Sequence, residues 1–167
     1  MRRRAVSIFV CLTACGMMFA AASAHANMSF SPAVGLAIDS QRALNENQPK
    51  KAIELGQKAI KSMDLPPSFS AYVWNNMCVA YTQLTKFSLA LDSCEQALKF
   101  NSADWRFLNN RGNALLGMGL ADDAITAYQA ALKDNPNSRI LQKNLEIAKK
   151  YKETGGVPLT FSQQPRF

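Results

Sequence analysis

Histidine is nearly absent from this sequence, since the 167 residues include only His25. Ser-His-Asp and Cys-His catalytic arrangements and most metal sites of mixed ligands need a histidine. His25 lies in a segment that we expect to be cleaved off. We therefore predict a protein that is not an enzyme, with no catalytic residues, no metal site and no cofactor.

Cysteine is also scarce, and two of its four positions lie near the N-terminus. Residues 1–26 combine a basic head at Arg2–Arg4, a charge-free apolar stretch and the small-residue sequence Ala24-His25-Ala26. This order is typical of a secretory signal peptide, and we expect cleavage after Ala26. The mature chain would then enter an oxidising compartment, the periplasm, with Cys78 and Cys94 as its only cysteines.

A second export signal leaves an alternative open. The residues Leu12-Thr13-Ala14-Cys15 are similar to a bacterial lipobox, in which Cys15 would carry a lipid. The protein would then be an outer-membrane lipoprotein, and its contact with a membrane would depend on that lipid. Residues 16–26 are mostly apolar, whereas a lipoprotein usually begins with a polar tether, so we favour soluble export.

An excess of positive charge is small once the first 26 residues are set aside. The whole chain carries +7, but three of its arginines lie in the signal segment, which leaves +4. A nucleic-acid-binding domain usually shows a stronger basic bias. We predict no nucleic-acid partner.

Small and apolar residue pairs recur at a fixed spacing. The stretch from Ala90-Leu91 to Ala97-Leu98 is matched 34 residues later by Ala124-Ile125 to Ala131-Leu132. A third copy begins at Ala52-Ile53, 38 residues before Ala90. A repeat of this length with helical apolar spacing predicts stacked helical hairpins.

In its marker residues the chain resembles the tetratricopeptide repeat (TPR) family. Trp74 and Tyr81 in the second copy, and Gly112, Tyr128 and Pro136 in the third, stand where that family prefers such residues. The resemblance implies an all-α solenoid of three helix-turn-helix repeats, at about residues 33–66, 71–104 and 105–138. It also places Trp74 in the interior between helices.

One further helix is predicted after the repeats. Leu141, Leu145, Ala148 and Tyr151 form a single apolar face over residues 138–152. A solenoid must cover its last apolar surface, so we interpret this segment as a capping helix that closes a TPR domain of residues 27–152. We expect a flexible tail at 153–167.

The resemblance places a ligand groove on the first helix of each repeat. We expect its side chains to face solvent and to bind a protein or an extended peptide that is not strongly acidic, with no small-molecule substrate. Some family members hold a terminal carboxylate with a clamp of Lys, Asn and Arg, but here Ala37, Gln41 and Asn110 replace three of its residues. The predicted partner-binding residues are Tyr72, Asn75, Asn76, Val79, Arg106, Asn109, Asn110 and Asn113.

The second hairpin brings two cysteines opposite each other. If its helices meet at a turn near Thr85-Lys86, facing residues have numbers that sum to about 171, and Cys78 and Cys94 sum to 172. We predict a disulfide, worth about 3 kcal/mol for a loop of about 17 residues. Two buried free thiols are the alternative.

These observations favour binding over chemistry. We expect a protein-protein interaction adaptor or scaffold of the cell envelope that holds its partner on the concave TPR surface. The alternative is a lipid-anchored structural component of the outer membrane, with the lipid on Cys15.

Overall fold

The protein is described by a computed structural model that covers residues 31–156. This range forms helices without any strand: α1 (Pro32–Asn45), α2 (Pro49–Lys61), α3 (Pro67–Gln83), α4 (Phe87–Phe100), α5 (Trp105–Gly117), α6 (Ala121–Asp134) and α7 (Arg139–Glu153). The prediction of an all-α solenoid is confirmed. The predicted signal peptide, Cys15 and most of the predicted tail lie outside the described residues.

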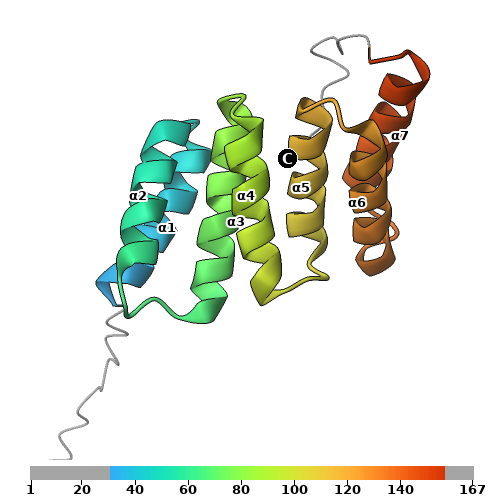
Figure 1. Ribbon diagram of the computed structural model, residues 1–167. Helices are drawn as coiled ribbons and strands as arrows, with labels where there is room; N and C mark the ends of the chain where they lie inside the picture. The colour runs from blue at the N-terminus through green and yellow to red at the C-terminus, as the bar shows by residue number, and fades with distance from the viewer. Residues whose placement is uncertain (1–30, 157–167) are drawn as a thin grey trace, which may run out of the picture.

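Consecutive helices pair as hairpins that stack in a row (Figure 1). The pairs are α1 with α2, α3 with α4 and α5 with α6, and α7 packs on α6 at the end of the row. Each odd-numbered helix also contacts the next odd-numbered helix, whereas the even-numbered helices make at most marginal contact with one another. The odd-numbered helices thus form one layer of the row and the even-numbered helices form the other. Because the odd-numbered layer is more closely packed, the row bends toward it, and the odd-numbered helices line the concave side.

The hairpin turns repeat with the same period as the sequence. Each turn contains one residue in the left-handed region: Asn47 and Thr85 with φ of 55°, and Gly119 with φ of 80°. The next residue donates its N–H five residues back, as Lys86 does to the Tyr81 carbonyl at 2.9 Å. This bond satisfies a carbonyl at the end of the helix. The repeat is therefore a feature of the backbone as well as of the side chains.

Alanines at the repeated positions let the helices approach closely. Ala side chains leave room for a neighbouring backbone, and close packing then removes water from both surfaces. All six have no exposed surface: Ala52, Ala59, Ala90, Ala97, Ala124 and Ala131.

One facing pair of interior positions is filled differently in each hairpin. In the third hairpin Gly112 faces Tyr128, and a Cβ on Gly112 would lie only 2.5 Å from the tyrosine ring. The equivalent residues of the second hairpin are Cys78 and Cys94, which form a buried disulfide with 5.2 Å between their Cα atoms. A glycine beside a tyrosine and two bridged cysteines thus fill the same space.

Trp74 departs from the sequence prediction. The sequence places it in the interior, but the side chain is only half-buried. One side packs on Ala71, Ala97 and Phe107, while another part lines an open cleft between α2 and α4. The reason is the curvature of the row, which spreads the even-numbered helices apart and leaves α3 partly uncovered between them.

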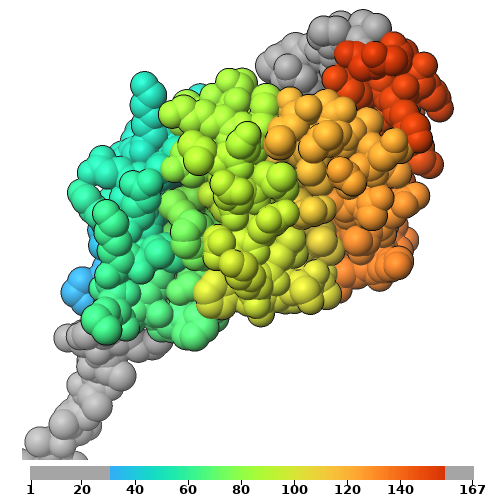
Figure 2. All heavy atoms as spheres, viewed as in Figure 1, coloured from blue at the N-terminus to red at the C-terminus, as the bar shows by residue number. Residues whose placement is uncertain are grey.

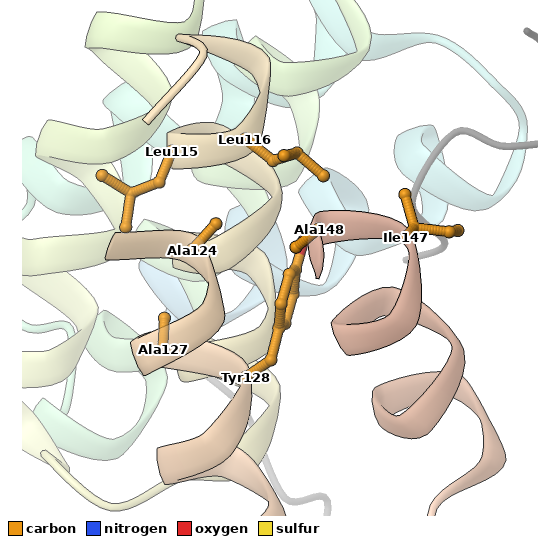
Figure 3. Packing of buried hydrophobic residues seen from close by; sticks show 7 residues of the cluster. All are labelled: Leu115, Leu116, Ala124, Ala127, Tyr128, Ile147 and Ala148. Atoms are coloured by element: carbon orange, nitrogen blue, oxygen red, sulfur yellow. The ribbon is translucent and has the colours of Figure 1, made fainter. Parts of the chain in front are cut away.

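Helix α7 covers the apolar end of the stack. Ile147 and Ala148 join Leu115, Leu116, Ala124, Ala127 and Tyr128 in one buried cluster (Figure 3). Without α7, the side of this cluster that faces it would be open to water.

None of the helices in residues 31–156 combines the length and the apolar character that a bilayer crossing needs.

Candidate functional site

The predicted site residues that remain accessible on the concave side lie on α3 and at the start of α5. Tyr72 is 50% exposed, Asn75 and Val79 are half-buried, and Arg106 is exposed. Tyr72, Asn75 and Val79 are three and four residues apart, which places them on one face of α3. These four predicted site residues form a surface that a partner can reach, which we call the α3–α5 face.

The other four predicted site residues do not face solvent. Asn76, Asn109, Asn110 and Asn113 are between 1% and 6% exposed. The expectation that they lie open in the groove is wrong. The reason is the packing of successive odd-numbered helices, which places the amides between α3, α5 and α7 instead of at the surface.

The buried amides form a continuous hydrogen-bond chain across the stack. Asn110 Nδ2 donates to Asn75 Oδ1 at 2.9 Å, and Asn109 Nδ2 donates to Asn110 Oδ1 at 3.2 Å. Asn144 of α7 then donates to Asn109 Oδ1 at 2.8 Å and lies 3.4 Å from Asn113 Oδ1. Asparagine has both donors and acceptors on one short side chain, so it can link helices in this way. These amides therefore join the repeats to one another.

Tyr128 ends this chain inside the third hairpin. Its hydroxyl donates to Asn113 Oδ1 at 2.8 Å, and the side chain has no exposed surface. Burial raises the pKa of Tyr128 well above its ordinary value, because a phenolate would be far from water. Tyr128 is thus a neutral donor that holds Asn113.

A pocket that the sequence did not indicate lies beside the α3–α5 face. It has a volume of about 270 Å³ and lies between the starts of α3 and α5 and the end of α4. Tyr72 and Phe107 meet edge to face at 5.8 Å between ring centroids, and Phe100 on the rim is 48% exposed. An apolar side chain fits the chemistry of this pocket.

Arg106 lies next to the pocket and is held by two neighbours. Its guanidinium carbon is 4.9 Å from the centroid of the Trp105 ring, and its Nη1 is 3.4 Å from the Asp104 carboxylate. The Asp104 carboxylate also accepts the Arg106 backbone N–H at 2.8 Å and so caps α5. The arginine is positioned at the surface, where its other N–H groups can meet a carbonyl or carboxylate.

Residues 31–156 contain no group of three or more His, Cys, Asp or Glu side chains that could hold a metal ion. The α3–α5 face presents aromatic, amide and guanidinium groups.

Comparison with known proteins supports the TPR assignment. Residues 105–138, which include α5 and α6, match the tetratricopeptide repeat family. The chain is 33% identical to the heat shock protein STI1 of Saccharomyces cerevisiae over 96 residues, which are 58% of this chain and 16% of the yeast protein. The chain thus spans about a sixth of the length of that relative.

Solved structures of TPR domains have the same fold. The first TPR domain of human RPAP3 is 22% identical, with a TM-score of 0.66 over 73% of this chain and 93% of that domain. A first TPR of Spaghetti (RPAP3) bound to the HSP90 peptide SRMEEVD has a TM-score of 0.65 and 22% identity, over 72% of this chain and 95% of that one. The described chain has the TPR fold.

Proposed function

We propose that this protein is a non-catalytic adaptor of the cell envelope that binds an extended peptide segment of a partner protein on its concave side. The observation that carries the proposal is the α3–α5 face, where Tyr72, Asn75, Val79 and Arg106 remain accessible. A solved TPR domain of the same fold holds a peptide. The likeness supports the class of partner and not its identity.

The chemistry of the face defines what the peptide should contain. An apolar side chain enters the pocket beside Tyr72 and Phe107. Asn75 accepts a hydrogen bond from Asn110, which leaves its own Nδ2 donor for a peptide carbonyl. Arg106 binds a second carbonyl or a carboxylate. Because Ala37 and Gln41 replace clamp residues, we do not expect the face to select a strongly acidic C-terminus.

A double variant tests this surface. Replacing both Tyr72 and Arg106 by Ala removes the ring and the guanidinium, and neither side chain belongs to the buried core. We expect loss of partner capture in the native envelope with an unchanged far-ultraviolet circular dichroism spectrum and disulfide. A matched control replaces Lys99 and Lys133 by Ala, two exposed residues on α4 and α6. Partner capture that survives the Tyr72/Arg106 change would overturn the assignment of this face.

The location in the envelope is proposed from two features. Residues 1–26 have the pattern of a signal peptide, and the buried Cys78–Cys94 disulfide needs an oxidising compartment to form. Thiol labelling of the denatured, unreduced protein should find no reactive thiol among these two in exported material. Intact mass separates the two envelope forms, because a chain that begins at Asn27 excludes a lipid on Cys15, and a diacylated Cys15 excludes soluble export.

A further inference from the structure

A second cleft lies on the outer side of the first two hairpins, away from the α3–α5 face. Helices α2 and α4 form its walls and α3 forms its floor, and its volume is about 420 Å³. Figure 2 shows α3 (green) at the bottom of the gap between α2 (teal) and α4 (yellow-green). This volume lies in the range of sites for small organic ligands.

The floor of the cleft is aromatic. Trp74 and Tyr81 are seven residues apart, so they lie on the same face of α3, about 10 Å from each other along the helix axis. Both are half-buried, and Leu89 on the α4 wall is 46% exposed. The negative face of such an accessible ring can pack against the C–H groups of a flat ligand.

The polar groups around this floor have unused hydrogen-bonding capacity. The Trp74 indole N–H has no hydrogen-bond acceptor within residues 31–156. Every buried side-chain nitrogen or oxygen in this range has a partner, so this unpaired N–H must be exposed to solvent. The Lys61 ammonium on α2 and the Asp92 carboxylate on α4 also have no partner in this range. The cleft thus presents the Trp74 and Lys61 donors and the Asp92 carboxylate over an aromatic floor, where the Tyr81 hydroxyl accepts from Gln57 Nε2 at 3.5 Å.

The next hairpin carries an ion pair where this cleft has neutral side chains. Glu95 stands for Gln57 at the 38-residue offset between the first two copies, and Arg111 stands for Met77 at the 34-residue offset between the next two. Arg111 and Glu95 pair with each other at 3.5 Å. The equivalent place one hairpin further along is therefore bridged by charges, whereas Gln57 and Met77 are uncharged.

We propose that this cleft is a binding site for a neutral saccharide of one or two sugar rings. Lys61 and Asp92 are the charged residues of the lining, and their opposite charges leave the cleft with no net charge to attract an anion or a cation. A sugar has a C–H face for Trp74 and Tyr81 and hydroxyls that can accept from Lys61 and Trp74 and donate to Asp92. A single apolar side chain of a protein would use the aromatic floor alone and leave these polar groups to water.

Tryptophan fluorescence of the purified protein tests the site directly. The chain contains only Trp74 and Trp105, so the Trp105→Phe variant has Trp74 as its single tryptophan. The probes are N,N′-diacetylchitobiose, cellobiose and maltose, with the acetylated peptide amide Ala-Phe-Ala as a mimic of a protein partner. We expect a saturable change in Trp74 emission with at least one sugar, and no such change in the Trp74→Phe variant, which retains Trp105.

A second variant connects the signal to the polar wall. Asp92→Asn removes the charged acceptor at an exposed position, and the affinity for the sugar should fall about tenfold. The matched control is Asp123→Asn, an exposed aspartate at the start of α6 that lies outside the cleft. It should leave the affinity unchanged. Equal affinities for the two variants would contradict the proposal.

The remaining outcomes also decide the matter. If the peptide saturates the emission change and none of the three sugars does, the cleft is a protein contact and the proposal is overturned. It is equally overturned if no probe changes the Trp74 emission. Neither result bears on the α3–α5 face, which lies on the opposite side of α3.

Discussion

The Nδ2 of Asn144 donates to Oδ1 of Asn109 across 2.8 Å, between the last helix and the third hairpin. Both side chains are buried, and Asn109 continues to Asn110 and Asn75, so α7 is linked to α3 through amides. A buried amide that loses its partner costs more than the bond itself gains. Helix α7 is therefore held by a specific polar contact in addition to the apolar surface that it covers.

Removal of this contact should destabilise the protein. In Asn144→Ala the Asn109 and Asn113 oxygens lose a buried donor, and we expect a loss of about 1–3 kcal/mol in the free energy of unfolding. Urea denaturation followed by circular dichroism measures it. Asn137→Ala, an exposed residue in the preceding turn, is the control and should change stability by less than about 0.5 kcal/mol. Equal midpoints for the two variants would show that the amide chain contributes nothing.

Two glycines in helices should respond oppositely to alanine. A Cβ on Gly112 would meet the Tyr128 ring at 2.5 Å, and that ring cannot move away because it is buried and bonded to Asn113. Gly112→Ala should therefore cost about 1–3 kcal/mol. Gly35 on α1 has open space, so Gly35→Ala should stabilise by roughly 0.5–1 kcal/mol through helix propensity. A Gly112→Ala variant as stable as the parent would contradict the tight contact with Tyr128.

Thr85 is strained in its turn. It has φ of 55°, where a β-branched side chain crowds the backbone, and the equivalent residue of the next hairpin is Gly119. Thr85→Gly should raise the unfolding free energy by about 1 kcal/mol. The control is Thr154→Gly at the end of α7, where φ is −84° and glycine relieves no strain. If both changes lower the melting temperature to a similar extent, the strain is not present in solution.

Tyr128 should make stability fall at alkaline pH. Its pKa in the folded protein is raised by burial above the ordinary value of 10.0. Above pH 10 the unfolded chain loses the phenolic proton while the folded chain keeps it, so the folded state binds more protons and stability falls as pH rises. The contribution of this group is fully present below pH 10.

A comparison of variants isolates this effect. Tyr128→Phe lacks the titrating hydroxyl, so its urea midpoint should decline less steeply between pH 10 and pH 11 than that of the parent, although it is less stable at neutral pH. Identical slopes for the parent and Tyr128→Phe would show that Tyr128 does not titrate differently in the two states.

The helices could be predicted from the sequence, but the solvent exposure of particular side chains could not. The recurrence of Ala52, Ala90 and Ala124 identifies the repeat because close helix packing requires small residues at fixed spacing. Asn109 and Asn113 occupy the stripe that the spacing predicts, but their burial depends on how near α7 comes to α5. That distance depends on contacts between residues 31 to 35 positions apart in the sequence. The spacing of apolar residues within one helix carries no information about such contacts.

The same limit applies to the two pockets. The pocket beside Tyr72 needs Phe100 at the end of α4, and the outer cleft needs the separation of α2 from α4. The family resemblance points only to the first helix of each repeat as a binding surface. Phe100 is recognisable in the sequence as an aromatic residue near the end of a helix, whereas the half-exposed state of Trp74 follows only from the curvature of the stack.

Site-specific photocrosslinking in the native envelope tests the central claim most directly, namely that the concave side holds a peptide of a partner protein. A photoreactive amino acid is placed at Gln41, an exposed residue on the concave stripe of α1, or at Lys99, an exposed residue on α4. The account predicts a covalent adduct with the partner from position 41 that disappears when Tyr72 and Arg106 are both replaced by Ala. An adduct that forms from position 99 alone, or one from position 41 that survives the double replacement, would contradict it.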